Sequence, residues 1–143
     1  MKQAKKIFTR MCLNNWGGIN HKILEFHEYV NLFSGKSGSG KSTVMDAIQV
    51  ILYGSFSPSF LNKAADDAKN RRSVLSYLRG EQKDGTANRE GQDFCSQIVL
   101  ELQDTGTKQY VCMGLLLKYG KTILKYESSF ISAISEKCRR VGI

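Results

Sequence analysis

Apolar and polar positions divide the chain into a β-rich first third, one helix, a weakly patterned middle and a second β-rich region. Residues 7–14 predict a short strand, and residues 22–26 predict a second strand that pairs back against it after a turn with two glycines. Residues 29–34 form a nearly continuous apolar run, which is typical of a strand buried on both faces. The first third is therefore expected to supply three strands.

A glycine-rich stretch at residues 35–40 follows this run and leads into a predicted amphipathic helix. The apolar side chains of the helix recur at spacings of three and four, which places them on one face: Val44, Ala47, Ile48, Ile51 and Leu52. Gly54 marks the end of the helix, because glycine readily adopts the left-handed conformation of a C-terminal cap.

The middle of the chain, residues 55–93, has few large apolar side chains and many basic ones: Lys63, Lys69, Arg71, Arg72, Arg79, Lys83 and Arg89. We expect a basic excursion here, with one or two short helices, one of them over residues 73–78. A solvated helix face is the favoured explanation of Arg71 and Arg72, and contact with DNA or phosphate is the alternative.

The last part of the chain returns to a β pattern. Residues 94–103 and 108–119 flank a hairpin turn in which glycine is available for a positive φ. Residues 122–126 predict a further strand, and residues 130–143 predict a marginal helix without a capping signal.

The composition is that of an ordinary globular domain: of 143 residues, 41% are hydrophobic and 24% are charged. The longest apolar runs fall far short of the roughly 20 residues that a membrane-spanning helix needs. No apolar stretch follows the basic N-terminus as it would in a secretory signal, so we expect a cytoplasmic protein that avoids membranes. The formal net charge of +8 favours a polyanionic partner, such as a nucleotide or a nucleic acid.

One motif carries chemistry, because residues 35–42 fit the pattern GxxxxGK[ST] at every fixed position. Its members are Gly35, Lys36, Ser37, Gly38, Ser39, Gly40, Lys41 and Ser42. Glycines let the backbone amides face inward around an anion, and the helix that follows adds the positive end of its dipole. Lys41 offers an ammonium to the β- and γ-phosphates, Ser42 offers a hydroxyl to Mg²⁺, and Thr43 adds a backbone amide. The sequence therefore predicts nucleotide binding, and the absence of a guanine-reading Asn-Lys-x-Asp motif favours ATP.

Several residues around this loop carry a family resemblance. They are Leu13, Asn15 and Trp16 at a strand end, Glu25 and Phe26 in the next strand, the loop itself, and Asp46, Ala47 and Ile48 in the helix. In this order they resemble the N-terminal head segment of SMC-type ATPases. Trp16, together with residues 73–80, is similar to the MukB-like bacterial condensins, in particular the JetC proteins of the Wadjet type. The likeness is specific over residues 7–54 and suggestive over 70–104.

The resemblance implies half of an ABC-type head, in which this lobe supplies the phosphate loop and a distant C-terminal lobe supplies the acidic pair and the signature segment. Two heads sandwich two ATP molecules, kleisin-type subunits can join them, and the assembly acts on DNA in chromosome organisation or plasmid defence. The implied cofactors are ATP and Mg²⁺, and a strand glutamine helps to hold the Mg²⁺. Gln103, Gln97 and Gln109 are all candidates, with Gln103 preferred because it stands just before the hairpin turn.

The sequence departs from a complete head in two respects: it has no LSGGQ-like signature and no apolar run that ends in Asp-Glu. Residues 98–101 imitate the second feature, but Leu102 follows and the segment alternates as a strand does. We therefore expect ATP binding without competent hydrolysis by this chain alone, and we assign no catalytic residue. Hydrolysis would require the C-terminal lobe and a second head.

The expected fold is of the α/β class, a P-loop lobe whose mixed sheet has an antiparallel β-rich portion. The lobe covers residues 1–127, and residues 128–143 form an unpatterned tail that truncation of a larger gene would explain. Two other functions fit the same sequence. One is a stand-alone small P-loop kinase with a lid built from Arg71, Arg72, Arg79 and Arg89. The other is a truncated, non-catalytic nucleic-acid binder that has kept the loop as a relic.

Overall fold

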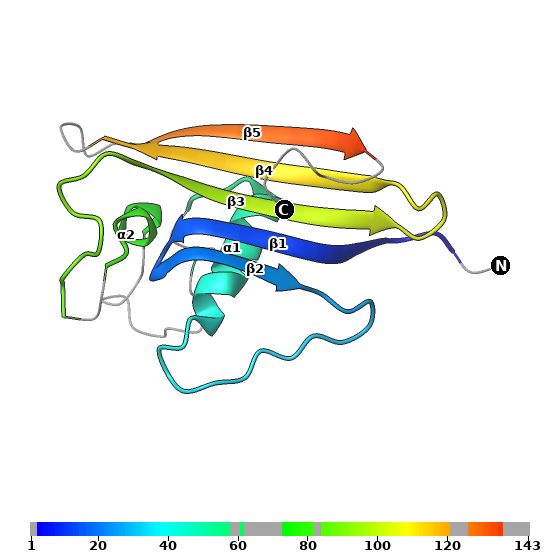
Figure 1. Ribbon diagram of the computed structural model, residues 1–143, viewed down its shortest axis with the longest axis horizontal. Helices are drawn as coiled ribbons and strands as arrows, with labels where there is room; N and C mark the ends of the chain where they lie inside the picture. The colour runs from blue at the N-terminus through cyan, green and yellow to red at the C-terminus, as the bar shows by residue number, and fades with distance from the viewer. Residues whose placement is uncertain (1–2, 58–60, 62–72, 82–83, 121–125, 136–143) are drawn as a thin grey trace.

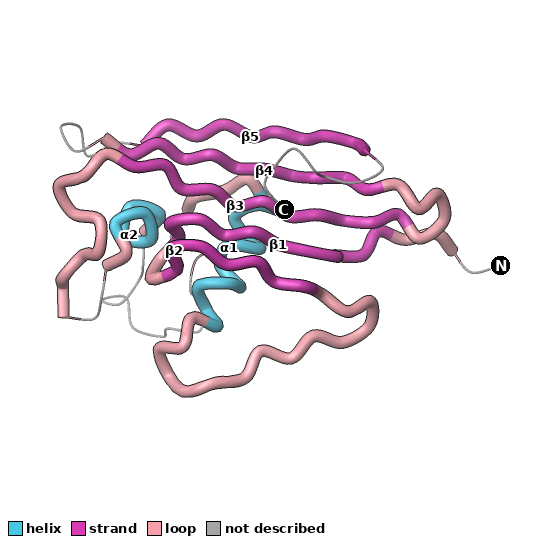
Figure 2. Tube along the Cα trace, in the orientation of Figure 1, coloured by secondary structure: helices cyan, strands magenta, loops and turns pink. Residues whose placement is uncertain are grey.

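The computed structural model describes residues 3–57, 61, 73–81, 84–120 and 126–135. These residues form a five-stranded sheet with a long helix lying across one of its faces (Figure 1). The elements in chain order are β1 (Lys6–Trp16), β2 (Ile19–Glu25), α1 (Lys41–Tyr53), α2 (Val74–Arg79), β3 (Phe94–Asp104), β4 (Tyr110–Tyr119) and β5 (Tyr126–Ser135). The strand order is β2-β1-β3-β4-β5, with the strands side by side in Figure 2. Each described pairing is antiparallel, so the parallel part of the expected mixed sheet is not among the described strands.

The hydrophobic core lies between α1 and one face of the sheet. Alternate residues of β1 and β3 point into it, and the apolar stripe of α1 covers them. Its members include Met11, Leu13, Trp16, Val44, Ala47, Val50, Ile51, Ile98, Leu100, Leu115 and Leu117. Full burial of one large apolar side chain contributes roughly 1.5–3 kcal/mol, so this contact fixes the position of α1 on the sheet. The predicted end of the helix is confirmed, because Gly54 is left-handed (φ 60°) and its N–H bonds the Val50 carbonyl at 2.9 Å.

The opposite face of the sheet carries a buried ion pair. Glu101 of β3 is 1% exposed and accepts hydrogen bonds from Nε and Nη2 of Arg10 at 3.0 and 2.9 Å. The hydroxyl of Thr9 donates to the same carboxylate at 2.8 Å. The hydrogen-bonded carboxylate raises the pKa of Arg10 above its usual value, despite an opposing effect of burial. The two faces of the sheet therefore differ in chemistry, with an apolar contact to α1 on one and charged groups on the other.

The expected strand over residues 29–34 is not formed in the structure, and this expectation is corrected here. Tyr29, Val30 and Leu32 are 78%, 76% and 86% exposed, and the segment is part of the loop that connects the end of β2 to α1 (Figure 1). Phe33 packs edge-on against Phe26, with ring centroids 6.5 Å apart. A strand needs a neighbour for its backbone and cover for both faces, and no described strand lies beside this run.

The predicted short helix after residue 73 is confirmed as α2. Ser73 caps it, since the Ser73 hydroxyl oxygen accepts from the N–H of Ser76 at 3.1 Å. The predicted hairpin is confirmed as β3 and β4. Much of the basic excursion, with Lys63, Lys69, Arg71, Arg72 and Lys83, lies outside the described residues.

The marginal helix expected over residues 130–143 is wrong for its described part, because Tyr126–Ser135 is strand β5. β5 pairs with β4 from Tyr119↔Tyr126 to Tyr110↔Ser135, and it crosses the expected boundary at residue 127. Strand formation here depends on the neighbouring strand, which short-range sequence patterns do not report. Within the described residues, neither helix is long and apolar enough to cross a membrane.

Candidate functional site

The glycine-rich loop approaches the N-terminus of α1 in a conformation that depends on its glycines. Gly38 and Gly40 have φ angles of 83° and 92°, a region that L side chains rarely adopt. Gly40 is the N-cap of α1, and no side chain caps the helix there. Its carbonyl accepts the first helical hydrogen bond, from the N–H of Val44 at 3.1 Å. The amides of the first turn are thus left without a side-chain cap at the positive end of the helix dipole, which is an arrangement suited to an anion.

The ammonium of Lys41 forms hydrogen bonds to three residues of the loop. Its Nζ donates to the carbonyl of Gly35 at 2.6 Å, to the carbonyl of Lys36 at 2.9 Å and to the hydroxyl of Ser39 at 3.2 Å. The N–H of Ser39 bonds the Lys36 carbonyl at 3.2 Å, which closes the turn. The structure therefore brings together four of the expected site residues, with Gly35, Lys36 and Ser39 around the positive charge of Lys41. Ser37 and Gly38 form the exposed tip of the loop.

Ser42 and Thr43 follow Lys41 and differ in their environment. Ser42 is exposed at the loop, whereas Thr43 is 5% exposed and faces the sheet. The carbonyl of Thr43 accepts a hydrogen bond from Nε1 of Trp16 at 3.0 Å. Ser42 is therefore accessible from solvent at the end of the loop, while Thr43 anchors the first turn of α1 to β1.

Gln103 does not come near Ser42 in the structure. It lies opposite Ile7, at the end of β3 remote from Trp16 and the first turn of α1. Ile98 lies in the half of β3 near Trp16. Gln103 stands five positions after Ile98, which corresponds to roughly 17 Å along a strand. The alternation of β3 also turns Gln103 to the face with Glu101, away from α1.

The two other candidate glutamines are not at the loop either. Gln97 shares the face of Glu101 and accepts a hydrogen bond from Nδ2 of Asn14 at 2.9 Å. Gln109 follows the β3–β4 turn, at the same end of the sheet as Gln103. The strand register, which the sequence does not give, places Gln103 and Gln109 at the end of the sheet remote from Trp16, and the alternation of β3 places Gln97 on the face opposite α1. Within the described residues, no group of three or more His, Cys, Asp or Glu side chains is arranged to hold a metal ion. Ser42 remains the candidate ligand for Mg²⁺, which usually takes one or two protein ligands together with phosphate oxygens.

Trp16 is part of the hydrophobic core beneath the loop. Its ring is fully buried and stacks on Tyr77, with centroids 4.7 Å apart and an interplanar angle of 8°. The Tyr77 hydroxyl in turn donates to the carboxylate of Asp46, which is 3% exposed. The roles of Tyr77 and Asp46 were not predicted from the sequence. The sequence signal that could have found them is the position of Asp46 next to Ala47 on the apolar face of the helix, because a carboxylate that is buried needs a hydrogen-bond partner.

Arg89 is buried rather than available to a lid. It is 6% exposed, and its guanidinium donates to the carbonyls of Gly17 at 2.6 Å and Leu78 at 2.8 Å. It also lies 5.5 Å from the ring centroid of Phe94. Burial lowers the pKa of Arg89 from its usual value. Arg79 forms an ion pair with Glu90 at 2.9 Å, so neither described arginine of the expected kinase lid faces the loop as a free cation.

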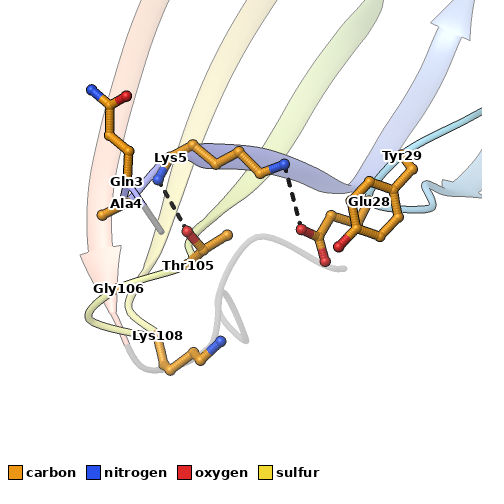
Figure 3. A pocket seen from close by; sticks show the side chains of 8 residues that line it. All are labelled: Gln3, Ala4, Lys5, Glu28, Tyr29, Thr105, Gly106 and Lys108. Atoms are coloured by element: carbon orange, nitrogen blue, oxygen red, sulfur yellow. Dashed lines mark hydrogen bonds and ion pairs between the residues drawn. The ribbon is translucent and has the colours of Figure 1, made fainter. Parts of the chain in front are cut away.

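The hollow in Figure 3 lies away from the phosphate loop, beside the start of β1 and the β3–β4 turn. It has a volume of about 500 Å³, and two of its charged side chains are paired, since Nζ of Lys5 lies 3.4 Å from Oε1 of Glu28. Its lining is Gln3, Ala4, Lys5, Glu28, Tyr29, Thr105, Gly106 and Lys108. It adds nothing to the phosphate-binding arrangement.

Comparison with known proteins points to the same loop. Residues 8–68 match the family model described as the P-loop containing region of AAA domain. A stretch of 74 residues is 37% identical to the SbcC component of the nuclease SbcCD from Staphylococcus haemolyticus (strain JCSC1435), covering 49% of this chain and 6% of that protein. The chain therefore spans only a small part of this relative's length.

A solved structure described as "Structural biochemistry of ATP-driven dimerization and DNA stimulated activation of SMC ATPases" is similar over 88% of this chain and 69% of its own. The TM-score is 0.56 and the sequence identity 13%. This likeness shows the fold, so the predicted class of a P-loop α/β lobe with an antiparallel β-rich portion is confirmed. Together the matches support an N-terminal P-loop segment of an SMC-like ATPase.

Proposed function

We propose that this chain binds Mg-ATP as the N-terminal half of an SMC-like ATPase head. The observation that carries the proposal is the position of Lys41, whose ammonium sits inside a glycine loop at the uncapped N-terminus of α1. Three separate sources of positive potential converge at this point: the ammonium, the loop amides and the helix dipole. A di- or triphosphate is the ligand that uses all three.

The chain's own residues suffice to bind and orient phosphate. The ammonium of Lys41 would exchange its bonds to the Gly35 and Lys36 carbonyls for bonds to phosphate oxygens, beside the amides of the first turn of α1, which no side chain caps. The hydroxyl of Ser42 would hold Mg²⁺, which supplies neutralisation of the phosphate charge when bound. ATP hydrolysis also needs a group that orients the attacking water, and we assign this role to none of the described residues.

An exposed apolar segment supports the idea of a half-head. Tyr29, Val30 and Leu32 stand directly before the loop and are exposed, an unusual state for a run with the composition of a buried strand. A strand supplied by a C-terminal lobe would cover them and provide their backbone partners. The same lobe would bring the acidic pair, and a second head would complete each ATP site.

The finer assignment follows from the sequence resemblance and the charge. A net charge of +8 suits assembled heads that sit on DNA, with an affinity that falls as salt rises. We further propose membership of the MukB- and JetC-like group, with kleisin-type partners and a role in chromosome organisation or plasmid defence. Trp16 and residues 73–80 are the features that favour this group.

The purified chain is expected to bind Mg-ATP while hydrolysing it scarcely at all. Release of phosphate, measured with a coupled assay, should stay well below the roughly 1 s⁻¹ that marks the slow end of ordinary enzymes. Lys41→Ala serves as the control, because any activity that survives this substitution comes from a contaminant. Turnover near 1 s⁻¹ that disappears in Lys41→Ala would refute the half-head proposal and favour a self-sufficient enzyme.

A further inference from the structure

The back of the phosphate loop rests on two stacked aromatic rings. Trp16 donates its Nε1–H to the carbonyl of Thr43 at 3.0 Å, and Thr43 belongs to the same helical turn as Lys41. Tyr77 stacks on Trp16 at 4.7 Å, and both rings are fully buried. Because protein interiors are closely packed, a shift of either ring must be passed to the first turn of α1.

Trp16 is one contact with α1, and Tyr77 makes another through its hydroxyl, which donates to the buried carboxylate of Asp46. Asp46 lies three residues after Thr43, so the two contacts with α1 are one helical turn apart. Two contacts one turn apart fix both the height and the rotation of the helix start. Tyr77 therefore holds the part of α1 that carries the phosphate-binding groups, although it is 36 positions after Lys41 in the sequence.

The position of Tyr77 is itself fixed by the turn between β1 and β2. The N–H of Gly17 donates to the Tyr77 carbonyl at 2.9 Å, and Arg89 donates to the Gly17 carbonyl at 2.6 Å. A β-carbon at Gly17 would lie 2.8 Å from Cγ2 of Thr43, so the turn and the helix are in direct contact. Tyr77 of α2 and Arg89 are thus linked through Gly17 to the first turn of α1, which follows the phosphate loop.

We propose that Tyr77 and Asp46 are positioning residues for nucleotide phosphate, acting through the first turn of α1. The inference rests on the proposed function, since it concerns how the same loop is held. Neither side chain needs to touch the nucleotide: the Tyr77–Asp46 bond sets the direction in which Lys41 and Ser42 point. Coupling of this kind is reciprocal, so phosphate in the loop must also stabilise α2.

The test is a titration of the full chain with Mg-ATP, followed by the fluorescence of Trp16, which is the single tryptophan in the sequence. Tyr77→Phe keeps the stacked ring and removes the hydroxyl, and Asp46→Asn keeps the shape and removes the charge. Each is expected to raise the Kd for Mg-ATP about tenfold, which corresponds to about 1.4 kcal/mol. Tyr110→Phe, a partly buried tyrosine at the far end of β4, is the matched control and should bind as the unaltered chain does.

The outcomes separate the two proposals. If the unaltered chain does not bind Mg-ATP, the proposed function fails and this inference fails with it. If the unaltered chain binds and Tyr77→Phe binds equally well, the positioning role alone is wrong and Tyr77 only packs the core.

A second measurement needs no variant and covers the case in which the variants do not fold. In hydrogen exchange on the unaltered chain, Mg-ATP is expected to slow the exchange of the α2 amides as well as those of the loop. Slower exchange confined to the loop and α1, with α2 unchanged, would overturn the coupling.

Discussion

Replacement of Lys41 by alanine is expected to raise the Kd of the chain for Mg-ATP by about a hundredfold or more, because truncating one partner of a charged hydrogen-bonded pair costs about 2–5 kcal/mol. In the structure the Lys41 ammonium makes three hydrogen bonds to the loop itself, at 2.6, 2.9 and 3.2 Å. These bonds place the charge at the centre of the site before any ligand arrives. Equilibrium titration with a fluorescent ATP analogue measures the effect.

Lys36→Ala is the matched control for this prediction. Lys36 is a lysine of the same loop at a variable position of the motif, and it is exposed. Its carbonyl, which contacts Lys41, is retained in the variant. Removal of the Lys36 side chain should change the Kd for Mg-ATP only about twofold, as expected for an exposed surface charge. Equal losses in the two variants would mean that the loop attracts ATP by general charge and not by a specific position of Lys41.

Replacement of Trp16 by alanine is expected to lower the free energy of unfolding by about 3–5 kcal/mol, because a fully buried tryptophan leaves a large cavity. The substitution removes the stack on Tyr77 and leaves the Thr43 carbonyl without its indole donor. For a chain of this size the melting temperature should fall by roughly 10–17 °C. Circular dichroism during urea unfolding measures the loss, since the variant contains no tryptophan for fluorescence.

Met45→Ala provides the comparison for Trp16→Ala. Met45 lies on the outer face of α1 and is 45% exposed, and methionine and alanine are both good helix formers. A change within about 0.5 kcal/mol is expected. A loss below about 1 kcal/mol for Trp16→Ala would contradict the place given to Trp16 beneath the phosphate loop.

The parts of the molecule that the sequence predicted well are those decided by short-range patterns. The glycine loop, the start of α1 at Lys41 and its end at Gly54 follow from neighbouring residues whose conformational preferences agree. The antiparallel hairpin of β3 and β4 was predictable for the same reason, because a turn signal separates two strand-like runs.

The features that short-range patterns did not predict depended on contacts between distant parts of the chain. The apolar run at residues 29–34 has the composition of a buried strand, but no described strand pairs with it. The preference for Gln103 required the register of β3, which alone decides the end and the face on which that side chain lies. The link between Tyr77 and Asp46 joins residues 31 positions apart, and nothing in the local sequence of either residue names its partner.

The most direct test of the central claim is a crystal structure of the chain with Mg²⁺ and a non-hydrolysable ATP analogue. We expect the β-phosphate within the loop of residues 35–42, the Ser42 hydroxyl on the metal ion, and the Lys41 ammonium released from the Gly35 and Lys36 carbonyls to contact phosphate oxygens. A nucleotide bound elsewhere, with Lys41 still bonded to those two carbonyls, would contradict the claim.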